Sequence, residues 1–407
     1  MELKDFENLP RIDWENSQIA CKHLNNFELA RSYFIFKLMT YPNLVKIGTR
    51  LIKWALKLHI PVELLLKHGL FFHFCGGESI GECQVLQRKL NKLHVGCVLD
   101  YAVEGKTLEA EFDSNLKEIL ATICAANSTA KQQEHAFAVF KLSGVARFEL
   151  LEKVSERLPL NSQEEKEWHK VHQRVSLLAK TAYNEGVKLL IDAEESWIQK
   201  AIDNLAEEMQ EIYNRDGPVI FNTVQMYRRD RYQYLVDQVQ KAERDSLYLG
   251  IKLVRGAYME RERERAKKKG YPSPIHANKA ETDIAFDKAL KLYKEHSVYF
   301  SIFAGTHNQK STQLLVEILD SLRRENGGKD LQTAYFSQLL GMSDNLTFPL
   351  AERGFAVFKY VPFGPVKEAI PYLIRRAEEN SSIDAHIEVT LKYIKRELKR
   401  RMLAKNI

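Results

Sequence analysis

Residues 187–224, VKLLIDAEESWIQKAIDNLAEEMQEIYNRDGPVIFNTV, contain the pattern that decides the fold. A short apolar run at 187–192 precedes a polar stretch at 194–214 whose apolar residues recur at helical spacing, and a second apolar run follows at 219–224. Short apolar runs are typical of buried strands, and the periodic stretch is typical of an amphipathic helix. Strand, helix and strand in this order predict a right-handed crossover between two parallel strands.

The same pattern recurs along most of the chain. The apolar runs are 95–100, 137–142, 187–192, 219–224, 249–254, 298–303, 332–337 and 355–360. Eight such units over about 290 residues predict an α/β fold with a (βα)8 TIM-like barrel, which typically needs ~250 residues. The alternative is a doubly wound open sheet, which usually begins with a G-x-G-x-x-G turn that this sequence lacks.

The segment before the first predicted strand reads as helical, with apolar residues at helical spacing and prolines between the runs. We therefore predict an N-terminal helical arm at 1–90 and a barrel domain at 91–400. The stretch 103–135 is longer than a simple crossover, and we expect it to carry extra helices. No internal repeat is present.

The composition indicates a soluble globular protein: 45% of the 407 residues are hydrophobic and 28% are charged. The net charge of +6 is small, and the run RERERAKKKG at 261–270 alternates in sign before it becomes basic, which is typical of a solvated helix face. A basic nucleic-acid-binding module therefore remains only as an alternative, and we expect no nucleic-acid partner.

The cysteine pattern favours a reducing compartment. The sequence has five cysteines and no C-x-x-C pair, so we predict neither a disulfide framework nor a zinc site, and no bound metal. The first twenty residues lack a basic region followed by an apolar one, and no apolar stretch is long enough to span a bilayer. These features predict a cytoplasmic location.

Polar residues stand at the ends of the predicted strands, where barrel enzymes carry their chemistry. They are Asp100, Tyr101, Lys141, Asp192, Gln225, Tyr227, Lys252, Arg255, Thr306, His307, Asn308, Ser337, Gln338, Leu339 and Tyr360. One lysine near a strand end is usually solvated. Many charged side chains at one rim are costly to bury unless they pair with one another or with a ligand, so the pattern predicts a binding site there.

A basic pair lies in the predicted helix that follows the last strand. Tyr372 and Arg375 are three residues apart and share a face, and Arg376 lies about 100° further round the helix. Two adjacent guanidinium groups are suited to gripping a carboxylate by bidentate hydrogen bonds. The alternative is a solvated basic helix end, but the position directly after the eighth strand favours the site.

Several motifs carry a resemblance to a known family. They are LDYAVEG (99–105), VFKLSG (139–144), IDAEE (191–195), NTVQMY (222–227), GIKLVRGAY (250–258), GTHN (305–308), YFSQLLGM (335–342) and KYVPFGPVKEAIPYLIRRAEEN (359–380). In their order and spacing they resemble the proline dehydrogenase family, including the matching domain of proline utilisation A. The resemblance covers roughly residues 90–390.

The resemblance implies an enzyme that oxidises L-proline to Δ1-pyrroline-5-carboxylate. It implies FAD bound non-covalently at the barrel mouth, the last helix over that mouth, and quinone as the electron acceptor. The basic segment 28–58 would then either contact an anionic membrane surface or pack as an arm against the barrel. A membrane contact would give a peripheral location at the inner face of the membrane, which is the mitochondrial matrix side if the source is eukaryotic. The arrangement as an arm is favoured.

The resemblance also implies roles for individual residues. Lys141, Arg375 and Arg376 would bind the substrate carboxylate, Leu339, Tyr360 and Tyr372 would line the pocket for the proline ring, and Asp192 and Lys252 would be catalytic. The residues expected to contact FAD are Ala193, Gln225, Lys252, Val254, Arg255, Gly256, Ala257, Tyr258, Lys279, Thr282, Thr306, His307 and Glu379. Glu104 would pair with Arg375 as a gate.

One of these residues departs from the family pattern, and two others have an open alternative. Some bacterial members have RLVKGAY where this chain has KLVRGAY, so Lys252 would act on the flavin as a point charge instead of a guanidinium fork. Lys279 and Thr282 open a predicted helix, and they would either meet the FAD pyrophosphate or cap the helix.

Other functions remain in consideration. The resemblance disfavours a hydroxyproline dehydrogenase, because the members of the superfamily that act on hydroxyproline tend to have a small residue where this chain has Tyr360. A Schiff-base aldolase barrel would use Lys141 or Lys252 as its nucleophile.

Overall fold

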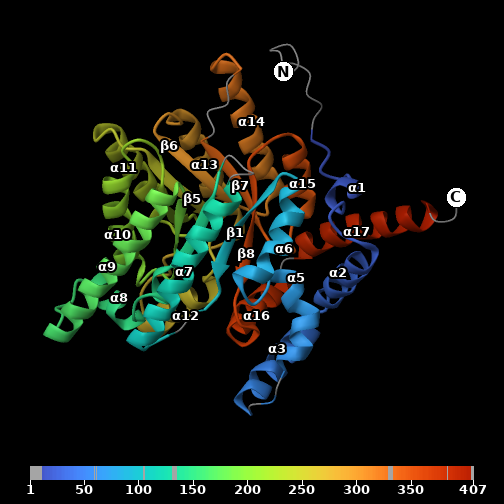
Figure 1. Cartoon of the computed structure of the whole chain (residues 1–407), viewed down its shortest axis with the longest axis horizontal. Helices are drawn as coiled ribbons and strands as arrows, with labels where there is room; N and C mark the ends of the chain where they lie inside the picture. The colour runs from blue at the N-terminus through green and yellow to red at the C-terminus, as the bar shows by residue number, and fades with distance from the viewer. Residues whose placement is uncertain are drawn as a thin grey trace. The chain divides into compact units, whose positions relative to one another are not determined.

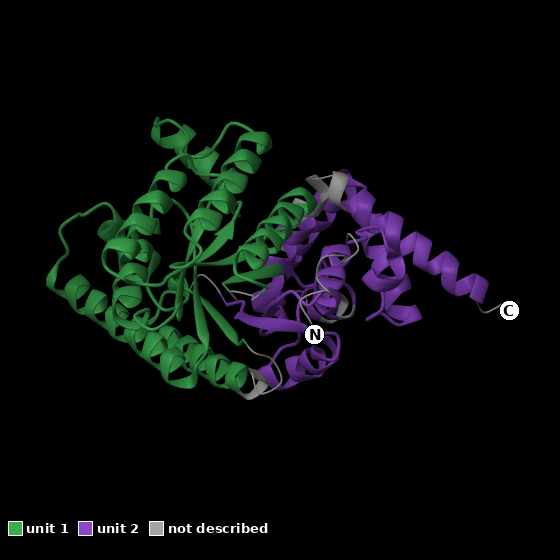
Figure 2. Ribbon diagram, turned by 90° about the horizontal axis from the view of Figure 1, so that it is seen from above, with its two compact units in different colours: residues 1–9, 104–337 green, residues 10–103, 338–407 purple. Residues whose placement is uncertain are grey.

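A computed structural model describes residues 12–58, 60, 62–103, 106–130, 135–328, 333–382 and 384–404 (Figure 1). The chain divides into two compact units (Figure 2). The described residues of unit 1 lie within 104–337, and those of unit 2 lie within 10–103 and 338–407.

The strands form one closed barrel in the order β1 to β8. Their bounds are β1 (Val95–Tyr101), β2 (Phe137–Lys141), β3 (Lys188–Asp192), β4 (Ile220–Gln225), β5 (Leu249–Val254), β6 (Phe300–Gly305), β7 (Ala334–Leu339) and β8 (Val357–Phe363). The registered pairs are parallel throughout. The predicted eight-stranded α/β barrel is therefore confirmed.

Helices precede, separate and follow the strands. Before β1 are α1 (Ser17–Ala20), α2 (Asn26–Met39), α3 (Pro42–Lys57), α4 (Glu63–Leu66), the π-helix η2 (Lys67–Phe71), α5 (Phe72–Phe74) and α6 (Ile80–Asn91). Between the strands are α7 (Glu109–Ala130), the 3-10 turn η3 (Leu142–Gly144), α8 (Phe148–Ser155), α9 (Ser162–Glu185), α10 (Gln199–Tyr213), α11 (Arg231–Arg244), α12 (Met259–Lys269), α13 (Lys279–Glu295), α14 (Gln309–Glu325) and α15 (Asp344–Glu352). After β8 come α16 (Val366–Ser382) and α17 (Asp384–Ala404).

The predicted strand positions are accurate to one residue for β1 to β5 and are about two residues too early for β6 to β8. Val298 shows why, because it is 67% exposed in a turn that continues α13, closed by a hydrogen bond from Phe300 N to His296 O at 3.0 Å. The expectation that Tyr360 ends the eighth strand is wrong. Pairing with β1 continues to Phe363, so Tyr360 lies in the middle of β8.

Two helix predictions also need correction. The described residues of 106–130 hold one long helix, α7, where several extra helices were expected. The helix predicted at 194–214 begins only at Gln199, because the Gln199 side chain accepts a hydrogen bond from the backbone N of Glu194 at 3.0 Å and keeps that segment in a loop.

An aromatic layer fills the barrel interior of unit 1. The ring of Phe137 on β2 lies 5.7 Å from Phe221 on β4, 4.8 Å from Phe303 on β6 and 4.9 Å from Tyr335 on β7. These strands are not all neighbours, so their rings can meet only inside the barrel. Because side chains alternate along a strand, Lys141 also faces inward, four residues beyond Phe137.

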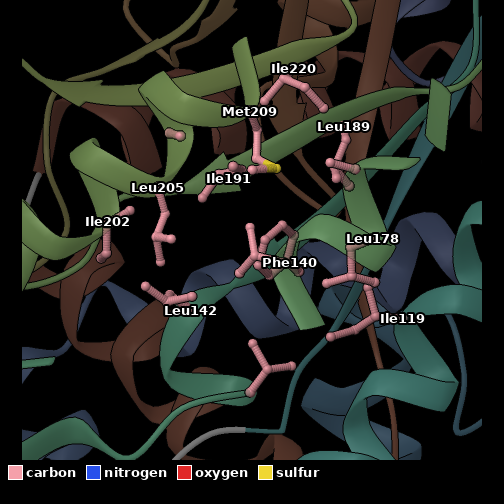
Figure 3. Packing of buried hydrophobic residues seen from close by; sticks show 14 of the residues in the cluster. Ile119, Phe140, Leu142, Leu178, Leu189, Ile191, Ile202, Leu205, Met209 and Ile220 are labelled. Atoms are coloured by element: carbon pink, nitrogen blue, oxygen red, sulfur yellow. The ribbon is translucent and has the colours of Figure 1, made fainter. Parts of the chain in front are cut away.

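A second apolar layer lies between the strands and their helices in unit 1. Phe140, Leu189 and Ile191 project from β2 and β3 on the face opposite to the interior residues, toward Leu178 of α9 and Leu205 of α10 (Figure 3). All five side chains are at most 2% exposed. Both faces of β2 and β3 are therefore buried, as expected for parallel strands covered by helices.

Unit 2 contains a buried ion pair beside the predicted pocket residue Tyr360. Lys359 is 1% exposed, and its Nζ lies 2.7 Å from Asp344 Oδ1 and donates to Met342 O at 2.6 Å. His23 Nε2 lies 3.3 Å from the other carboxylate oxygen of Asp344. Burial alone would raise the pKa of Asp344, but Lys359 and His23 hold that pKa well below its usual range.

We expect Asp344→Asn to lower the free energy of unfolding by about 3–5 kcal/mol, because it leaves the Lys359 ammonium buried without its counter-charge. Glu352→Gln is the control: Glu352 pairs with Lys22 at the surface of the same unit, where a pair contributes about 0–1 kcal/mol. Urea titration at pH 7 measures both changes, and equal losses would contradict the assignment.

The same pair predicts a pH dependence. The pKa of Asp344 is depressed in the folded protein, so its stabilising contribution is present above the ordinary carboxyl pKa and is lost as the pH falls through the folded-state value. We therefore expect the Asn variant to lose less stability than the parent protein on acidification from pH 5 to pH 3.

Candidate active site

The most highly charged cluster of the predicted site lies at the ends of three strands of unit 1. Asp192 ends β3, Lys141 ends β2, and Lys252 lies in β5. Lys252 Nζ is 2.5 Å from Asp192 Oδ1, and Lys141 Nζ is 3.8 Å from Asp192 Oδ2. Asp192 and Lys252 are 7% and 6% exposed. The structure thus brings these three predicted residues together, with one carboxylate between two ammonium groups.

Gln225 connects the ends of three strands. Its Nε2 donates to Glu194 O at 2.7 Å, and its Oε1 accepts a hydrogen bond from Ala257 N at 3.2 Å. Two residues earlier on the same inward face of β4, the buried Oγ1 of Thr223 has no hydrogen-bond partner among the described residues. Thr223 pairs with Lys252 in the β4–β5 register. An unsatisfied hydroxyl beside a cation suits a polar ligand at this end of the barrel.

The residues after β5 form a tight turn. Gly256 has φ +138°, and a Cβ at this position would meet the Tyr227 ring at 2.4 Å. Any larger residue would therefore push the backbone out of place. The neighbouring Ala257 is exposed and Tyr258 is buried, while Val254 at the end of β5 and Ala193 after β3 are half-buried and buried. The turn presents backbone that an extended ligand can approach closely.

Arg255 points toward helices instead of standing free at the mouth. Its guanidinium contacts Asp283 Oδ1 at 2.6 Å, Thr306 Oγ1 at 2.6 Å and Ser311 Oγ at 2.9 Å, and it lies 4.4 Å from the centre of the Phe286 ring. It connects the end of β5 to α13 and α14. Arg255 and Thr306 are therefore hydrogen-bonded to each other. His307, the residue after Thr306, is half-buried.

The start of α13 shows that the capping alternative for Lys279 and Thr282 is wrong. The N-cap is Asn278, whose side chain accepts from Glu281 N, so neither residue caps the helix. Lys279 is exposed and its Nζ lies 2.6 Å from Asp283 Oδ2, while Thr282 is buried and its Oγ1 donates to Asn278 O at 3.4 Å. The exposed helix N-terminus with a lysine suits an anionic group.

Five of the six residues expected to contact the substrate lie in unit 2, and the sixth, Lys141, lies in unit 1. Leu340 N donates to Tyr360 O at 2.9 Å, which fixes the backbone of β7 at Leu339 beside β8. On α16 the Arg376 guanidinium lies 5.4 Å from the centre of the Tyr372 ring, and both residues are 8% exposed. Arg375 is half-buried. A solvated helix end would expose these side chains, so that alternative for Arg376 is wrong.

Two predicted residues fall outside this description. Glu104, the expected gate, lies outside the described residues, as does the side chain of Glu379. Conversely, Glu194 and Ser143 are not among the predicted site residues, although they lie within the IDAEE and VFKLSG motifs. Ser143 N donates to Glu194 Oε1 at 3.0 Å, and both residues are buried. The signal available in the sequence was the second acidic residue of IDAEE, directly after an apolar strand.

Comparisons with known proteins agree with this architecture. The sequence profile of the family described as "Proline dehydrogenase" matches residues 84–388. The carbapenem antibiotics biosynthesis protein CarD of Pectobacterium carotovorum subsp. carotovorum is 34% identical over 330 residues, which cover 81% of this chain and 84% of that protein. Mitochondrial proline dehydrogenase 1 of Dictyostelium discoideum is 32% identical over 386 residues, covering 84% of this chain and 66% of that protein.

Among solved structures, proline utilization A from Bdellovibrio bacteriovorus inactivated by N-propargylglycine has a similar fold. The TM-score is 0.69 at 19% sequence identity, and the match covers 93% of this chain and 40% of that one. At this identity the likeness supports the barrel fold alone. The family profile covers most of the chain, and the predicted membership of the proline dehydrogenase family is therefore confirmed. The chain belongs to the proline dehydrogenase family.

Proposed function

We propose that the protein oxidises L-proline to Δ1-pyrroline-5-carboxylate on FAD and passes the electrons to a quinone. The observation that supports this most directly is the cluster of Lys141, Asp192 and Lys252 at the strand ends, in a chain of the proline dehydrogenase family. Overall, proline loses a hydride from C5 and a proton from its nitrogen, so two electrons leave the substrate.

FAD, when bound, supplies the two-electron acceptor for this hydride. The residues fit it: Lys252 provides a fixed positive charge for a reduced flavin, and Thr223 offers an unused hydroxyl nearby. Asp192 fixes the orientation of Lys252 and Lys141 through its two oxygens. We assign to the cofactor the turn after β5, Ala193, Gln225, Thr306 and His307, with Arg255 in a supporting position and Lys279 and Thr282 toward the pyrophosphate.

We assign the substrate carboxylate to Lys141, Arg375 and Arg376, because charge-assisted hydrogen bonds from guanidinium and ammonium groups are the strong ones for this group. Leu339, Tyr360 and Tyr372 would line the ring pocket. The proline nitrogen must be neutral when the hydride leaves, since a protonated nitrogen has no electron pair to stabilise the product iminium. Lys141 would orient the substrate and would not act as the base.

Two alternatives make different demands on the same residues. A Schiff-base aldolase needs a lysine nitrogen that is free to attack a carbonyl group, whereas Lys252 Nζ lies 2.5 Å from Asp192 Oδ1 and donates a hydrogen bond to it. A hydroxyproline substrate would have to fit beside the bulky Tyr360. Because one similar protein is named for carbapenem antibiotics biosynthesis, the substrate must be tested directly.

The surface of α3 supports a peripheral membrane contact. Leu44, Ile47, Leu51 and Trp54 recur at spacings of three and four residues, and all are 53–60% exposed. The α3 sequence contains four basic residues, Lys46, Arg50, Lys53 and Lys57, and no acidic one. An exposed apolar face beside basic residues suits an anionic bilayer surface. No described helix is long and apolar enough to cross a membrane.

An absorbance spectrum tests the proposal as a whole. We expect flavin bands near ~450 nm that bleach on anaerobic addition of L-proline, and less with 4-hydroxyproline, because the flavin accepts the electrons. Bands that proline does not bleach would keep the cofactor and reject the substrate. A colourless protein that cannot be reconstituted with FAD would reject both.

The two lysines are expected to differ kinetically. Lys141→Met should raise the KM for L-proline by about 10–100-fold, the scale of one lost charge-assisted hydrogen bond. Lys252→Met should lower kcat by roughly 10²–10³-fold through lost stabilisation of developing charge. Steady-state kinetics at matched FAD content separates the two roles. The exposed Lys200→Met serves as the control, and a KM effect in the Lys252 variant alone would contradict the assignment.

Co-sedimentation with vesicles tests the α3 surface. We expect the protein to sediment with vesicles containing anionic lipid, and the double variant Leu51→Glu, Trp54→Glu to lose most of this binding while keeping its flavin spectrum. Ile212→Glu is the control, because Ile212 is an apolar residue of α10 with a similar exposure, and this variant should bind vesicles like the parent protein. Unchanged binding of the double variant would exclude α3 as the contact.

A further inference from the structure

Glu194 is a buried carboxyl group that the proposed mechanism does not use. It lies two residues beyond β3 and is 3% exposed. Both of its carboxylate oxygens accept hydrogen bonds from Ser143, Oε1 from the backbone N at 3.0 Å and Oε2 from the hydroxyl. Burial raises the pKa of Glu194 to about 7, against the opposing effects of the Ser143 hydrogen bonds and the Lys141 charge. Such a costly group calls for a role.

The backbone of Glu194 is fixed as firmly as its side chain. Its N donates to Gln199 Oε1 at 3.0 Å at the start of α10, and its carbonyl accepts from Gln225 Nε2 at 2.7 Å. Gln225 in turn accepts from Ala257 N at 3.2 Å. A continuous chain of hydrogen bonds therefore runs from the turn after β2, through the ends of β3 and β4, to the turn after β5.

This chain joins residues with different proposed roles. Ser143 lies two residues after Lys141, in the turn η3, so the Glu194 side chain fixes how the backbone leaves β2 just beyond that lysine. At its other end Gln225 lies on the side assigned to the cofactor. Removing the carboxylate would leave the Ser143 N–H, in a residue only 9% exposed, without its acceptor.

We infer that Glu194 is a positioning residue that, through Ser143, holds Lys141 in place relative to Gln225. The inference rests on the proposed function, because it assigns to Glu194 the spacing between the carboxylate-binding lysine and the cofactor side. Its effect is expected on substrate affinity, since displacement of Lys141 weakens a contact made already when the substrate binds.

Three variants separate positioning from general stability. Glu194→Ala removes both hydrogen bonds to Ser143. Glu194→Gln retains them, because the amide oxygen accepts from Ser143 N while the amide nitrogen donates to the hydroxyl. Glu195→Ala is the matched control: Glu195 is also 3% exposed and adjacent in sequence, but its carboxylate pairs with Arg261 of α12 at 2.5 Å.

The measurements are proline kinetics and hydrogen exchange on the FAD-loaded protein. We expect Glu194→Ala to raise the KM for L-proline about tenfold or more, to change kcat by less than about threefold, and to speed amide exchange at residues 142–145. Glu194→Gln should restore both the KM and the slow exchange. Glu195→Ala should leave both unchanged.

Two results would overturn the inference. One is a normal KM in Glu194→Ala, whatever its exchange rate, which would make the residue purely structural. The other is the same KM increase in Glu195→Ala, which would show a general effect of loosening the loop. If L-proline does not bleach the flavin of the parent protein, the proposed function fails, and the KM can no longer test the inference. In that case, unchanged amide exchange at residues 142–145 in Glu194→Ala would refute the inference, because it would show that Glu194 does not hold Ser143 in place.

Discussion

The carboxylate of Asp192 between the ammonium groups of Lys252 and Lys141 is the interaction on which the chemistry of this barrel depends. The two lysines and the aspartate come from β2, β3 and β5, and they are stable side by side because their opposite charges attract one another. Apolar residues in place of the lysines and the aspartate would offer no charge to a substrate or cofactor. The cluster therefore links the stability of the strand ends to the proposed reaction.

The arrangement below this cluster is apolar. Phe137, Phe221, Phe303 and Tyr335 close the interior of unit 1 and separate the polar end of the barrel from the opposite end. Because side chains alternate along each strand, Lys141 lies on the same inward face as Phe137, and Gln225 lies on the same inward face as Phe221. Both polar residues are four positions further along their strands, toward the candidate site. Packing and chemistry thus share the same strands, with the aromatic residues at one end and the charged residues at the other.

Hydrogen bonds beyond the direct site refine this arrangement. The Arg255 guanidinium donates hydrogen bonds to Asp283, Thr306 and Ser311, and these bonds hold the end of β5. The family resemblance alone had implied a contact between Arg255 and the cofactor. Glu194 connects Ser143 and Gln225 in a similar way. In unit 2 the pair of Lys359 and Asp344 fixes the segment after β7. Glu194, Lys359 and Asp344 are buried and Arg255 is half-buried, and each of these ionisable side chains is held by polar partners.

The sequence by itself determined the barrel and its rim, because short apolar runs and helical periodicity are local properties of the chain. It located β5 without error and placed Lys141, Asp192 and Gln225 at strand ends. It misplaced the start of β6, since an exposed valine in a turn reads like one in a strand, and it passed over Glu194. Only the tertiary structure decided that Asp192 pairs with Lys252, that Glu194 accepts from Ser143 and that Asp283 pairs with Arg255. Those pairings join residues far apart in sequence, and no local pattern encodes the distance between them.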